Sequence, residues 1–321
     1  MTAGACWVLS NGRAGTVNQC LGLAEAIGLP ITIKEVRPRA PWRWLPPNMC
    51  LSALSSLKLS SDPLHPPWPD LVIACGRSTE ALAVAIRRAA QKSEHKIFTI
   101  YLQRPSHSTS QFDLLAPPQH DQVIGDNVIE TLGALHRITP ERLALAAEKF
   151  APLLDHLPRP LIAVLVGGTG NAYRMNETAA RKLGQNLAAL AQTRSVGLAV
   201  TVSRRTGTKN TPALRTALKD TPAVIWDGQG ENPYAGFLAL ADGIIVTADS
   251  ISMLSEACAV GKPVYVADMP GGSSKFERFH QSLRSAGHTR PYTGDFEFWP
   301  ATPLAETARV AAFVRDRLKI S

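Results

Sequence analysis

Short apolar runs alternate with helix-length amphipathic segments along nearly the whole chain. Polar or glycine-containing turns separate them, a pattern typical of parallel strands joined by right-handed helical crossovers. In the first half this pattern predicts strands over 5–10, 31–36, 70–75, 97–102, 113–116 and 122–125, and helices over 17–28, 79–92 and 140–155.

The segment HLPRP (156–160) interrupts this rhythm with two prolines, and the same scheme then starts again. The second half predicts strands over 161–166, 197–202, 223–226, 243–247 and 263–267, and helices over 176–192, 212–219, 233–239, 250–260, 274–286 and 303–318. A chain of 321 residues is long for one core. We therefore predict an α/β fold with two Rossmann-like domains, 1–157 and 158–302, followed by a C-terminal helix at 303–321.

The net charge of +8 favours anionic partners, but charge alone does not choose among nucleotide phosphates, acidic lipids and nucleic acid. The five cysteines are scattered without metal-ligand spacing, which indicates buried thiols in a reducing compartment and no metal site. The longest apolar run, 161–166, is too short to span a bilayer, and the chain enters a strand without a signal-peptide pattern. These features predict a cytoplasmic protein, soluble or peripheral to a membrane.

Polar residues follow several predicted strands of the first half, at the edge where ligands of parallel sheets bind. Helix amides and glycine turns at such ends can hold anions, although an ordinary strand–helix turn explains the first of them equally well. The candidates are Asn11, Gly12, Arg13, Gly15, Asn18 and Gln19 after the first strand, Gly76 and Arg77 after the third, and Gln103 and Arg104 after the fourth.

In the second half, VGGTGN (166–171) and TVSRRTG (201–207) follow consecutive strands. The first is not a dinucleotide loop, because Tyr173 stands at the third glycine position, and it is not a Walker loop. The paired arginines of the second suit bidentate phosphate binding, with a solvated turn as the alternative. The candidates are Gly167, Gly168, Thr169, Asn171, Ser203, Arg204, Arg205 and Thr206.

The start of the helix predicted over 250–260 is unusually polar. Asp249 or Ser250 would cap it, and serine hydroxyls lie beside its positive end. A capping box would place an acid three residues after the cap, so capping leaves Glu256 unexplained. A nucleoside diphosphate across this helix start, with its ribose on Glu256, would explain the whole set: Asp249, Ser250, Ser252, Met253 and Glu256.

Together these motifs resemble the family of the plant mitochondrial-fission protein Elongated Mitochondria. The resemblance also runs through GRAGTVNQCLGLAEA, DLVIACGRST, LQRP, FDLLAPPQHD and DNVIETLGALHRIT, so it covers nearly the whole chain. It implies a GT-B glycosyltransferase-like fold, with two Rossmann-like domains facing a cleft and a C-terminal helix crossing back to the first. Bacterial relatives often have Asp in place of Asn11 and His in place of Thr16, so the general base is unassigned here.

The resulting hypothesis is a metal-independent transfer from a nucleotide-diphosphate sugar, as substrate rather than cofactor, to an acceptor bound by the first domain. Such a transfer needs a base for the acceptor hydroxyl and positive groups for the leaving diphosphate. Asp121, His120 and Asp126 are the candidate bases, and Asn127 joins the acceptor side. One alternative is a non-catalytic nucleotide-binding or recruitment protein. A nucleotide-sugar epimerase ranks third, because neither a dinucleotide loop nor a Tyr-x-x-x-Lys pair is present.

The segment 37–59 combines tryptophans and leucines with cations and contains no acidic residue. Trp42 and Trp44 beside Arg39 and Arg43 suit a membrane interface and predict docking on an anionic lipid surface at the cytoplasmic face. The acceptor would then be lipid-linked or a cell-envelope glycan, and nucleic acid is not an expected partner. The alternative is a helix folded onto the first domain, since the leucines at 51, 54 and 57 also suit a buried stripe.

Overall fold

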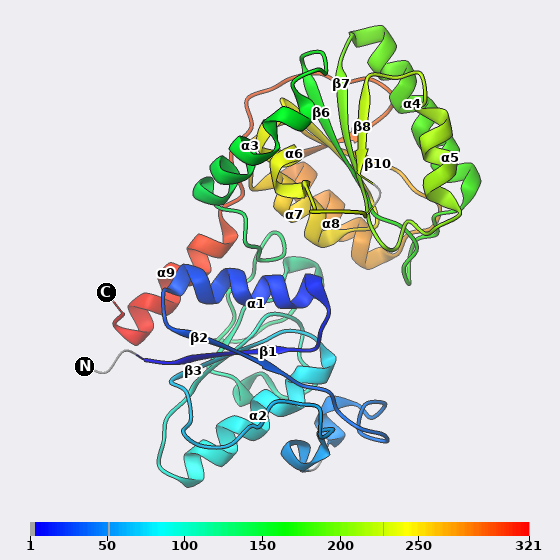
Figure 1. The fold of residues 1–321 in the computed structure, drawn as a ribbon. Coiled ribbons are helices and arrows are strands. Elements are labelled where there is room, and N and C mark those ends of the chain that lie inside the picture. Colours follow the sequence, from blue (N-terminus) through cyan, green and yellow to red (C-terminus); the bar gives the residue numbers. More distant parts are fainter. Residues whose placement is uncertain (1–3, 51, 227, 321) are drawn as a thin grey trace. The chain divides into compact units, whose positions relative to one another are not determined.

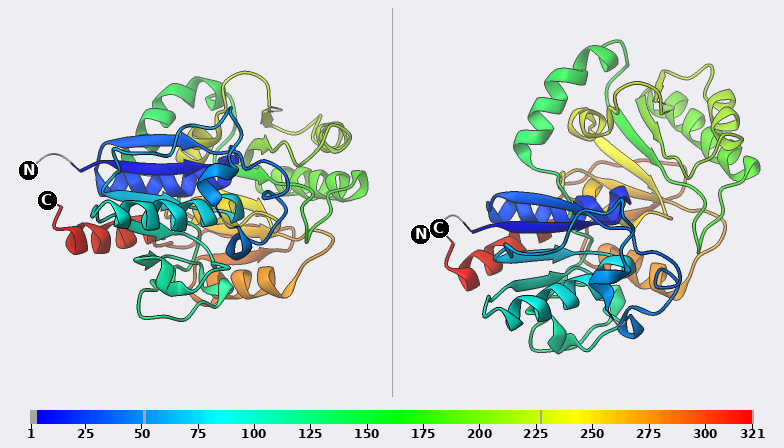
Figure 2. Two further views of the ribbon diagram at one scale, coloured as in Figure 1. Left: turned by 90° about the horizontal axis from the view of Figure 1, so that it is seen from below. Right: turned by 60° about the horizontal axis from the view of Figure 1, so that its bottom comes forward.

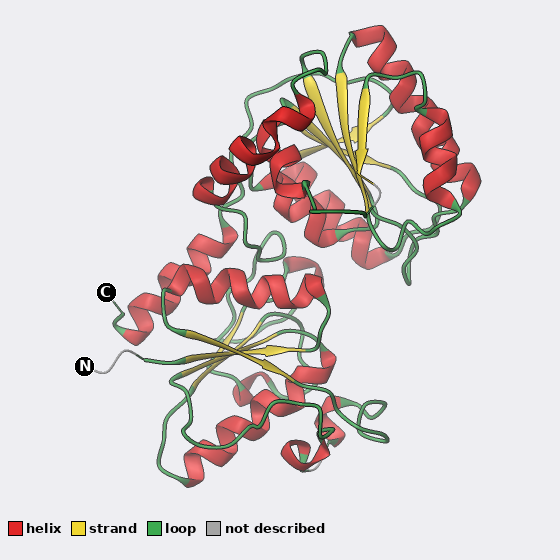
Figure 3. Ribbon diagram, in the orientation of Figure 1, coloured by secondary structure: helices red, strands yellow, loops and turns green. Residues whose placement is uncertain are grey.

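The computed structural model describes residues 4–50, 52–226 and 228–320. The chain forms two compact units: unit 1 comprises Met1–Arg137 and Ala305–Ser321, and unit 2 comprises Ile138–Leu304. Each unit is a parallel sheet with helices on both faces (Figures 1 and 3). The two Rossmann-like domains expected from the alternating pattern are therefore present.

Unit 1 contains a sheet with the order β2-β1-β3-β4-β5, in which all neighbours pair in parallel. Its strands are β1 (Cys6–Ser10), β2 (Ile31–Glu35), β3 (Leu71–Ala74), β4 (Phe98–Tyr101) and β5 (Leu114–Leu115). The inner strands β1 and β3 are buried along their whole length, as strands covered on both faces must be. Helix α1 (Ala14–Ile27) covers one face, and α2 (Arg77–Lys92) covers the other (Figure 1).

The last helix, α9 (Glu306–Leu318), belongs to unit 1 and packs against α1 (Figure 1); Figure 2 shows its red ribbon from two further sides. Val310, Ala311 and Val314 are buried in the same core cluster as the apolar face of α1. The predicted return of the C-terminal helix to the first domain is confirmed.

Unit 2 contains a parallel sheet with the order β11-β10-β9-β6-β7-β8, which is the strand order of a dinucleotide-binding Rossmann sheet. Its strands are β6 (Leu161–Val166), β7 (Gly197–Val202), β8 (Ala223–Trp226), β9 (Gly243–Thr247), β10 (Val264–Ala267) and β11 (Thr289–Tyr292). Its helices are α3 (Pro140–Leu154), α4 (Glu177–Arg194), α5 (Asn210–Ala217), α6 (Tyr234–Leu240), α7 (Ile251–Cys258) and α8 (Ser274–Ser285).

The boundary between the units lies at Arg137, not at the proline-rich segment near residue 157. The reason is the packing of α3, which lies against α6 and therefore within unit 2. Gly236 allows this approach, because a β-carbon there would lie 2.7 Å from Cβ of Phe150.

Two strand predictions were wrong. Residues 122–125 form no strand: Gln122 has a left-handed backbone (φ 50°) and the Ile124 side chain is 93% exposed. Conversely, β11 was missed because it contains Pro291, and proline is tolerated only in edge strands such as this one. The segment 37–59 forms no α-helix in its described residues, only the 3-10 helices η1 (Pro47–Met49) and η2 (Ala53–Ser56).

Each sheet has a point where the direction of strand addition reverses, and ligands of open α/β sheets bind there, beyond the carboxyl ends of the strands. In unit 1 this point lies between β1 and β3, and in unit 2 it lies between β6 and β9. The loops that leave these strands are the ones in which the sequence concentrates its polar residues.

Candidate functional site

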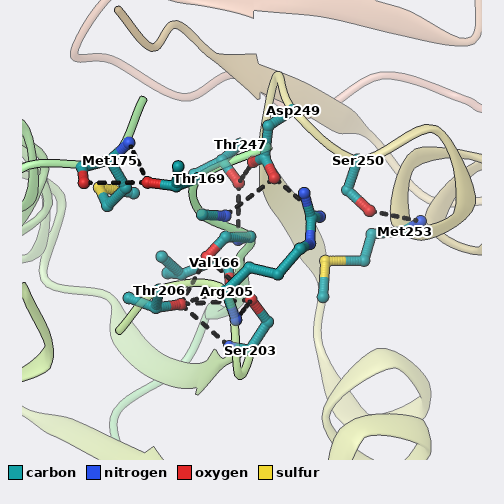
Figure 4. A network of polar contacts seen from close by, with 12 residues as sticks. Val166, Thr169, Met175, Ser203, Arg205, Thr206, Thr247, Asp249, Ser250 and Met253 are labelled. Atoms are coloured by element: carbon teal, nitrogen blue, oxygen red, sulfur yellow. Dashed lines mark hydrogen bonds and ion pairs between the residues drawn. The ribbon is translucent and has the colours of Figure 1, made fainter. Parts of the chain in front are cut away.

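In unit 2 the loops after β6 and β9 are joined by a hydrogen-bonded network (Figure 4). The Gly167 amide donates to Oγ1 of Thr247 at 2.8 Å, and the Gly168 amide donates to Oδ2 of Asp249 at 2.8 Å. The Thr247 hydroxyl in turn donates to Oδ1 of Asp249 at 2.7 Å. The two loops are therefore fixed relative to each other at the switch point.

The Asp249 carboxylate is the centre of this network. Its side chain is 1% exposed, and Nη2 of Arg205 lies 2.8 Å from Oδ2. Because the carboxylate is already bonded to the loops, it is not the helix cap. The cap of α7 is Ser250, whose Oγ accepts from the Met253 amide at 3.4 Å. Of the two cap candidates, the structure selects Ser250.

The two glycines after β6 are required by close packing. A β-carbon at Gly167 would lie 2.2 Å from Oδ1 of Asp249, and one at Gly168 would lie 2.0 Å from the backbone of Arg205. VGGTGN is therefore not a dinucleotide motif that has lost a glycine. It is a loop whose glycines admit a carboxylate and a neighbouring backbone.

Three candidate hydroxyls bond to backbone within the loops. Ser203 and Thr206 donate to the Gly167 carbonyl at 2.9 and 2.5 Å, and Thr169 donates to the Met175 carbonyl at 3.2 Å. Their role is to shape the site. Arg204 and Asn171 are exposed and have no hydrogen-bond or ion-pair partner among the described residues. Ser252 lies half-buried in the first turn of α7.

A pocket of about 820 Å³ opens beside this network, beyond the ends of β7 and β8. Arg204, Arg215, Trp226, Tyr234 and Met253 are among the residues that line it. Trp226 and Tyr234 were not predicted as site residues. The polar stretch after β8 could have indicated them, because it follows another strand end at the same edge of the sheet.

Behind the pocket residue Tyr234 lies a carboxylate with an unusual proton affinity. Glu256 is half-buried and accepts a hydrogen bond from the Tyr234 hydroxyl at 2.5 Å. Burial raises the pKa of Glu256 to about 7, against the smaller lowering effect of the Tyr234 hydrogen bond. The Tyr234 hydroxyl occupies the place on Glu256 that a ligand hydroxyl would take.

In unit 1 the loops after β1 and β3 also meet. Oδ1 of Asn11 accepts from the Arg13 amide at 3.0 Å and from the Thr16 hydroxyl at 2.8 Å. Gly76 lies against this turn, since a β-carbon there would lie 2.8 Å from Nδ2 of Asn11. Gly12, Arg13 and Gly15 are exposed, and Asn18 is half-buried in the first turns of α1.

The remaining acceptor-side candidates fall into two groups. Gln19 is buried, and its amide bonds to the Gly15 carbonyl and the Cys75 thiol, so it lies in the interior. Arg77 and Arg104 are exposed: Arg77 donates to the Trp44 carbonyl at 2.8 Å, and Arg104 donates to the Asp121 carbonyl at 3.3 Å. Gln103, the residue before Arg104, is half-buried.

The three candidate bases are not brought together. His120 and Asp121 follow β5 at the carboxyl edge, and both side chains are buried (2% and 7% exposed). Asp126 is exposed and lies at the opposite edge, because the chain returns and pairs in parallel with β5, Val128 beside Leu115. Asn127 is there as well, and donates to the Thr109 and Phe112 carbonyls.

Another acid and imidazole lie at the carboxyl edge of unit 1. Glu80, in the first turn of α2, and His107, in the loop after β4, are in contact. The motif DLVIACGRST ends one residue before Glu80, and LQRP ends two residues before His107, so neither residue was predicted. Within the described residues, no three His, Cys, Asp or Glu side chains gather to hold a metal ion.

The chain matches the sequence pattern of the family described as mitochondrial fission ELM1 over residues 14–318. The mitochondrial fission protein ELM1 of Arabidopsis thaliana is 31% identical over 389 aligned positions, covering 97% of this chain and 90% of that protein. The chain belongs to the mitochondrial fission ELM1 family. The resemblance inferred from the motifs is confirmed.

Solved structures with the same two-sheet architecture include GT-B enzymes. The UDP-GlcNAc 2-epimerase of Methanocaldococcus jannaschii has a TM-score of 0.52 at 11% identity, covering 97% of this ELM1-family chain and 99% of that protein. MurG of Acinetobacter baumannii has a TM-score of 0.50 at 13% identity, covering 98% and 91%. At such identities the similarity shows the fold alone. In the described part of the chain, no helix is both long and apolar enough to cross a membrane.

Proposed function

We propose that this ELM1-family protein binds a nucleotide-diphosphate sugar in unit 2 and transfers the sugar to an acceptor bound by unit 1. The observation that carries the proposal is the pocket beyond β7 and β8, which combines the exposed cation Arg204 with the aromatic residues Trp226 and Tyr234, and whose Tyr234 hydroxyl bonds to Glu256 behind it. The GT-B fold supports it, because the fold provides a sheet edge suited to such ligands.

The ligand fits this edge in three parts. The base enters the pocket beside Trp226, and the ribose hydroxyls take the position of the Tyr234 hydroxyl on Glu256. The diphosphate lies at the amide-rich start of α7, with Arg204 as a charge-assisted donor. Arg205 contributes indirectly, since its guanidinium is held by Asp249.

The transfer requires stabilisation of the charge that develops on the diphosphate as the glycosidic bond breaks. The proposal assigns this stabilisation to Arg204 and the α7 amides, without a metal ion or cofactor. Preorganisation comes from the network around Asp249, which fixes the loops before the ligand arrives.

Calorimetric titration with UDP, ADP and GDP, followed by their sugar conjugates, tests the binding step. Glu256→Gln and Arg204→Ala should each weaken the affinity of the preferred nucleotide about tenfold or more. Arg181→Ala is the matched control, because Arg181 is an exposed cation of unit 2 paired only with Glu177 on the surface of α4. No binding of any nucleotide by the parent protein would refute the proposal.

Two alternatives give different products from the same bound ligand. A recruitment protein would bind the nucleotide-sugar and leave it intact. An epimerase would isomerise the sugar without net transfer, and the earlier objection to it no longer holds: the UDP-GlcNAc 2-epimerase above shares this fold, so the missing dinucleotide loop does not exclude that chemistry. Chromatography of the products separates the three, and only transfer yields a glycosylated acceptor together with a nucleoside diphosphate.

We also propose that the acceptor is lipid-linked and that unit 1 docks on an anionic membrane through the segment 37–59. Trp44 and Met49 are 62% and 61% exposed, which is unusual for large apolar side chains. Arg43 lies over the Trp44 ring at 4.5 Å. Exposed aromatic and apolar groups among cations, without nearby acids in sequence, suit the headgroup region of an acidic bilayer.

Co-sedimentation with vesicles of phosphatidylglycerol and phosphatidylcholine tests this docking. The double substitution Trp44→Ala and Met49→Ala should reduce the bound fraction severalfold, while Phe298→Ala, which removes an equally exposed ring (51%) from unit 2, should not. Failure of the parent protein to sediment with acidic vesicles would exclude the membrane as the partner.

A further inference from the structure

Glu80 is a buried carboxylate that the proposed nucleotide site does not use. Its side chain is 1% exposed, and Oε1 accepts from the Ser106 amide at 2.6 Å and from the His107 amide at 2.8 Å. These two amides hold the loop after β4 against the first turn of α2.

The same oxygen binds the imidazole of His107, with Nδ1 at 2.8 Å from Oε1. An ionised carboxylate only accepts hydrogen bonds, so Nδ1 carries the proton and Nε2 of the neutral ring keeps its lone pair. The His107 side chain is 12% exposed, and Nε2 has no hydrogen-bond partner within the described ranges. This is the arrangement of a general base whose orientation and tautomer are set by an acid behind it.

The dyad lies where a base for unit 1 is needed. His107 follows Gln103 and Arg104 in the loop at the carboxyl end of β4, and Glu80 follows Gly76 and Arg77 at the start of α2. Strand β3, which precedes α2, lies beside the switch point, and β4 is its neighbour in the interior of the sheet. By contrast, His120 and Asp121 are buried, and Asp126 lies at the opposite edge.

We propose that His107 is the general base for the acceptor hydroxyl and that Glu80 is its positioning residue. The assignment rests on the proposed glycosyl transfer. Nε2 of His107 takes the hydroxyl proton while the acceptor oxygen forms a bond to the anomeric carbon. The bond from that carbon to the diphosphate oxygen breaks, and its electron pair leaves with the nucleoside diphosphate. Glu80 stabilises the imidazolium that results, and solvent then removes the proton.

A loop anchor alone would not need the imidazole. The two backbone amides already bond to Glu80, and any side chain at position 107 would leave them in place. The third contact, between Nδ1 of His107 and Glu80, fixes the orientation of the imidazole. Anchoring the loop does not require this.

The tautomer of His107 is the first test, because it needs neither donor nor acceptor. In long-range ¹H–¹⁵N spectra of the full chain, with the signal assigned by its loss in His107→Ala, neutral His107 should carry its proton on Nδ1. A proton on Nε2 would overturn the proposal, since that nitrogen could not accept one.

Turnover is the second test, with the tightest-binding nucleotide-sugar of a panel (UDP-GlcNAc, UDP-glucose, ADP-glucose and GDP-mannose) and water as acceptor. His107→Ala should lower kcat for nucleoside diphosphate release about 100-fold or more, and Glu80→Gln about tenfold, with KM nearly unchanged. Added imidazole should partly restore the His107→Ala rate. His65→Ala, at an exposed histidine of the same unit, is the matched control.

The outcomes separate the two proposals. If no nucleotide binds to the parent protein, the proposed function fails while the tautomer still reports on the dyad. If the nucleotide-sugar binds but no diphosphate is released, or if His107→Ala turns over like the parent, the base assignment is overturned and nucleotide binding stands.

Discussion

The loops at the carboxyl edges of the two sheets are held in place by different kinds of contact. In unit 2 the loops at the switch point are fixed by a buried carboxylate, Asp249, which joins Gly168, Thr247 and Arg205. In unit 1 a neutral turn around Asn11 shapes the loop after β1, and the Glu80–His107 contact joins the start of α2 to the loop after β4. The first edge is therefore centred on one buried carboxylate, and the second is held by two separate contacts.

The difference follows from the ligand that each edge is proposed to hold. A diphosphate needs fixed cations and amides, and the buried Asp249 carboxylate keeps Arg205 and the glycine loop in place before binding. An acceptor needs one positioned base, which a histidine and one carboxylate supply.

Unit 1 also has a pocket of about 830 Å³, but it does not lie at the carboxyl edge of the sheet. Asp70, Lys96 and Phe98 are among its lining residues, at the amino ends of the strands.

The largest effect is expected from removing the centre of the unit 2 network. Asp249→Ala should lower the free energy of unfolding by about 2–4 kcal/mol, because it leaves the buried Gly168 amide and Thr247 hydroxyl without their partner, while the half-exposed Arg205 side chain can turn to solvent. Asn11→Ala, the corresponding change in unit 1, should cost about 1 kcal/mol, since its turn is partly solvated. Urea unfolding followed by circular dichroism measures both, and equal costs would remove the distinction between the edges.

A smaller loss of stability is expected from a substitution at one of two glycines in the loop after β6. Gly168→Ala should destabilise the protein by about 2–3 kcal/mol, because the new methyl would overlap the backbone of Arg205, which cannot move without breaking the network. At Gly170 a β-carbon meets only Nη1 of Arg205 at 3.3 Å, the end of a flexible side chain. Gly170→Ala is therefore the matched control, with an expected cost below about 1 kcal/mol. A tolerated Gly168→Ala would show that the loop is not tightly packed.

The alternating pattern predicted most of this fold because it depends on local periodicity, and inner strands such as β1, β3, β6 and β9 are apolar on both faces. The site was predicted only in part. That Asp249 bonds to Gly168, 81 residues away, and Glu80 to His107, 27 residues away, cannot be read from either motif. From the sequence, Ser203 and Thr206 were predicted to bind the ligand, whereas in the structure their hydroxyls donate hydrogen bonds to the Gly167 carbonyl. Only the packing of loops decides such partners.

Glu256 is an acid whose proton affinity rises on folding. The pKa of Glu256 is raised by burial to about 7 from its ordinary 4.5, so the folded protein holds a proton between these values that the unfolded chain releases. The free energy of unfolding should therefore fall as pH rises from about 5 to about 7 and then level off, by about 1–3 kcal/mol from this group. Glu256→Gln should remove that fall, and the difference between parent and variant across pH 5–8 isolates it.

Nucleotide binding should depend on the same titration with the opposite sign. The ionised carboxylate is the form that accepts two ribose hydroxyls, so affinity should rise as pH increases through about 7 and level off above it. Tyr234→Phe removes the hydrogen bond that lowers the pKa of Glu256, so the rise should move to higher pH in that variant. Calorimetry with UDP at pH 6, 7 and 8 measures both. A pH-independent affinity in the parent, equal to that of Glu256→Gln, would mean that the ribose does not bind to Glu256.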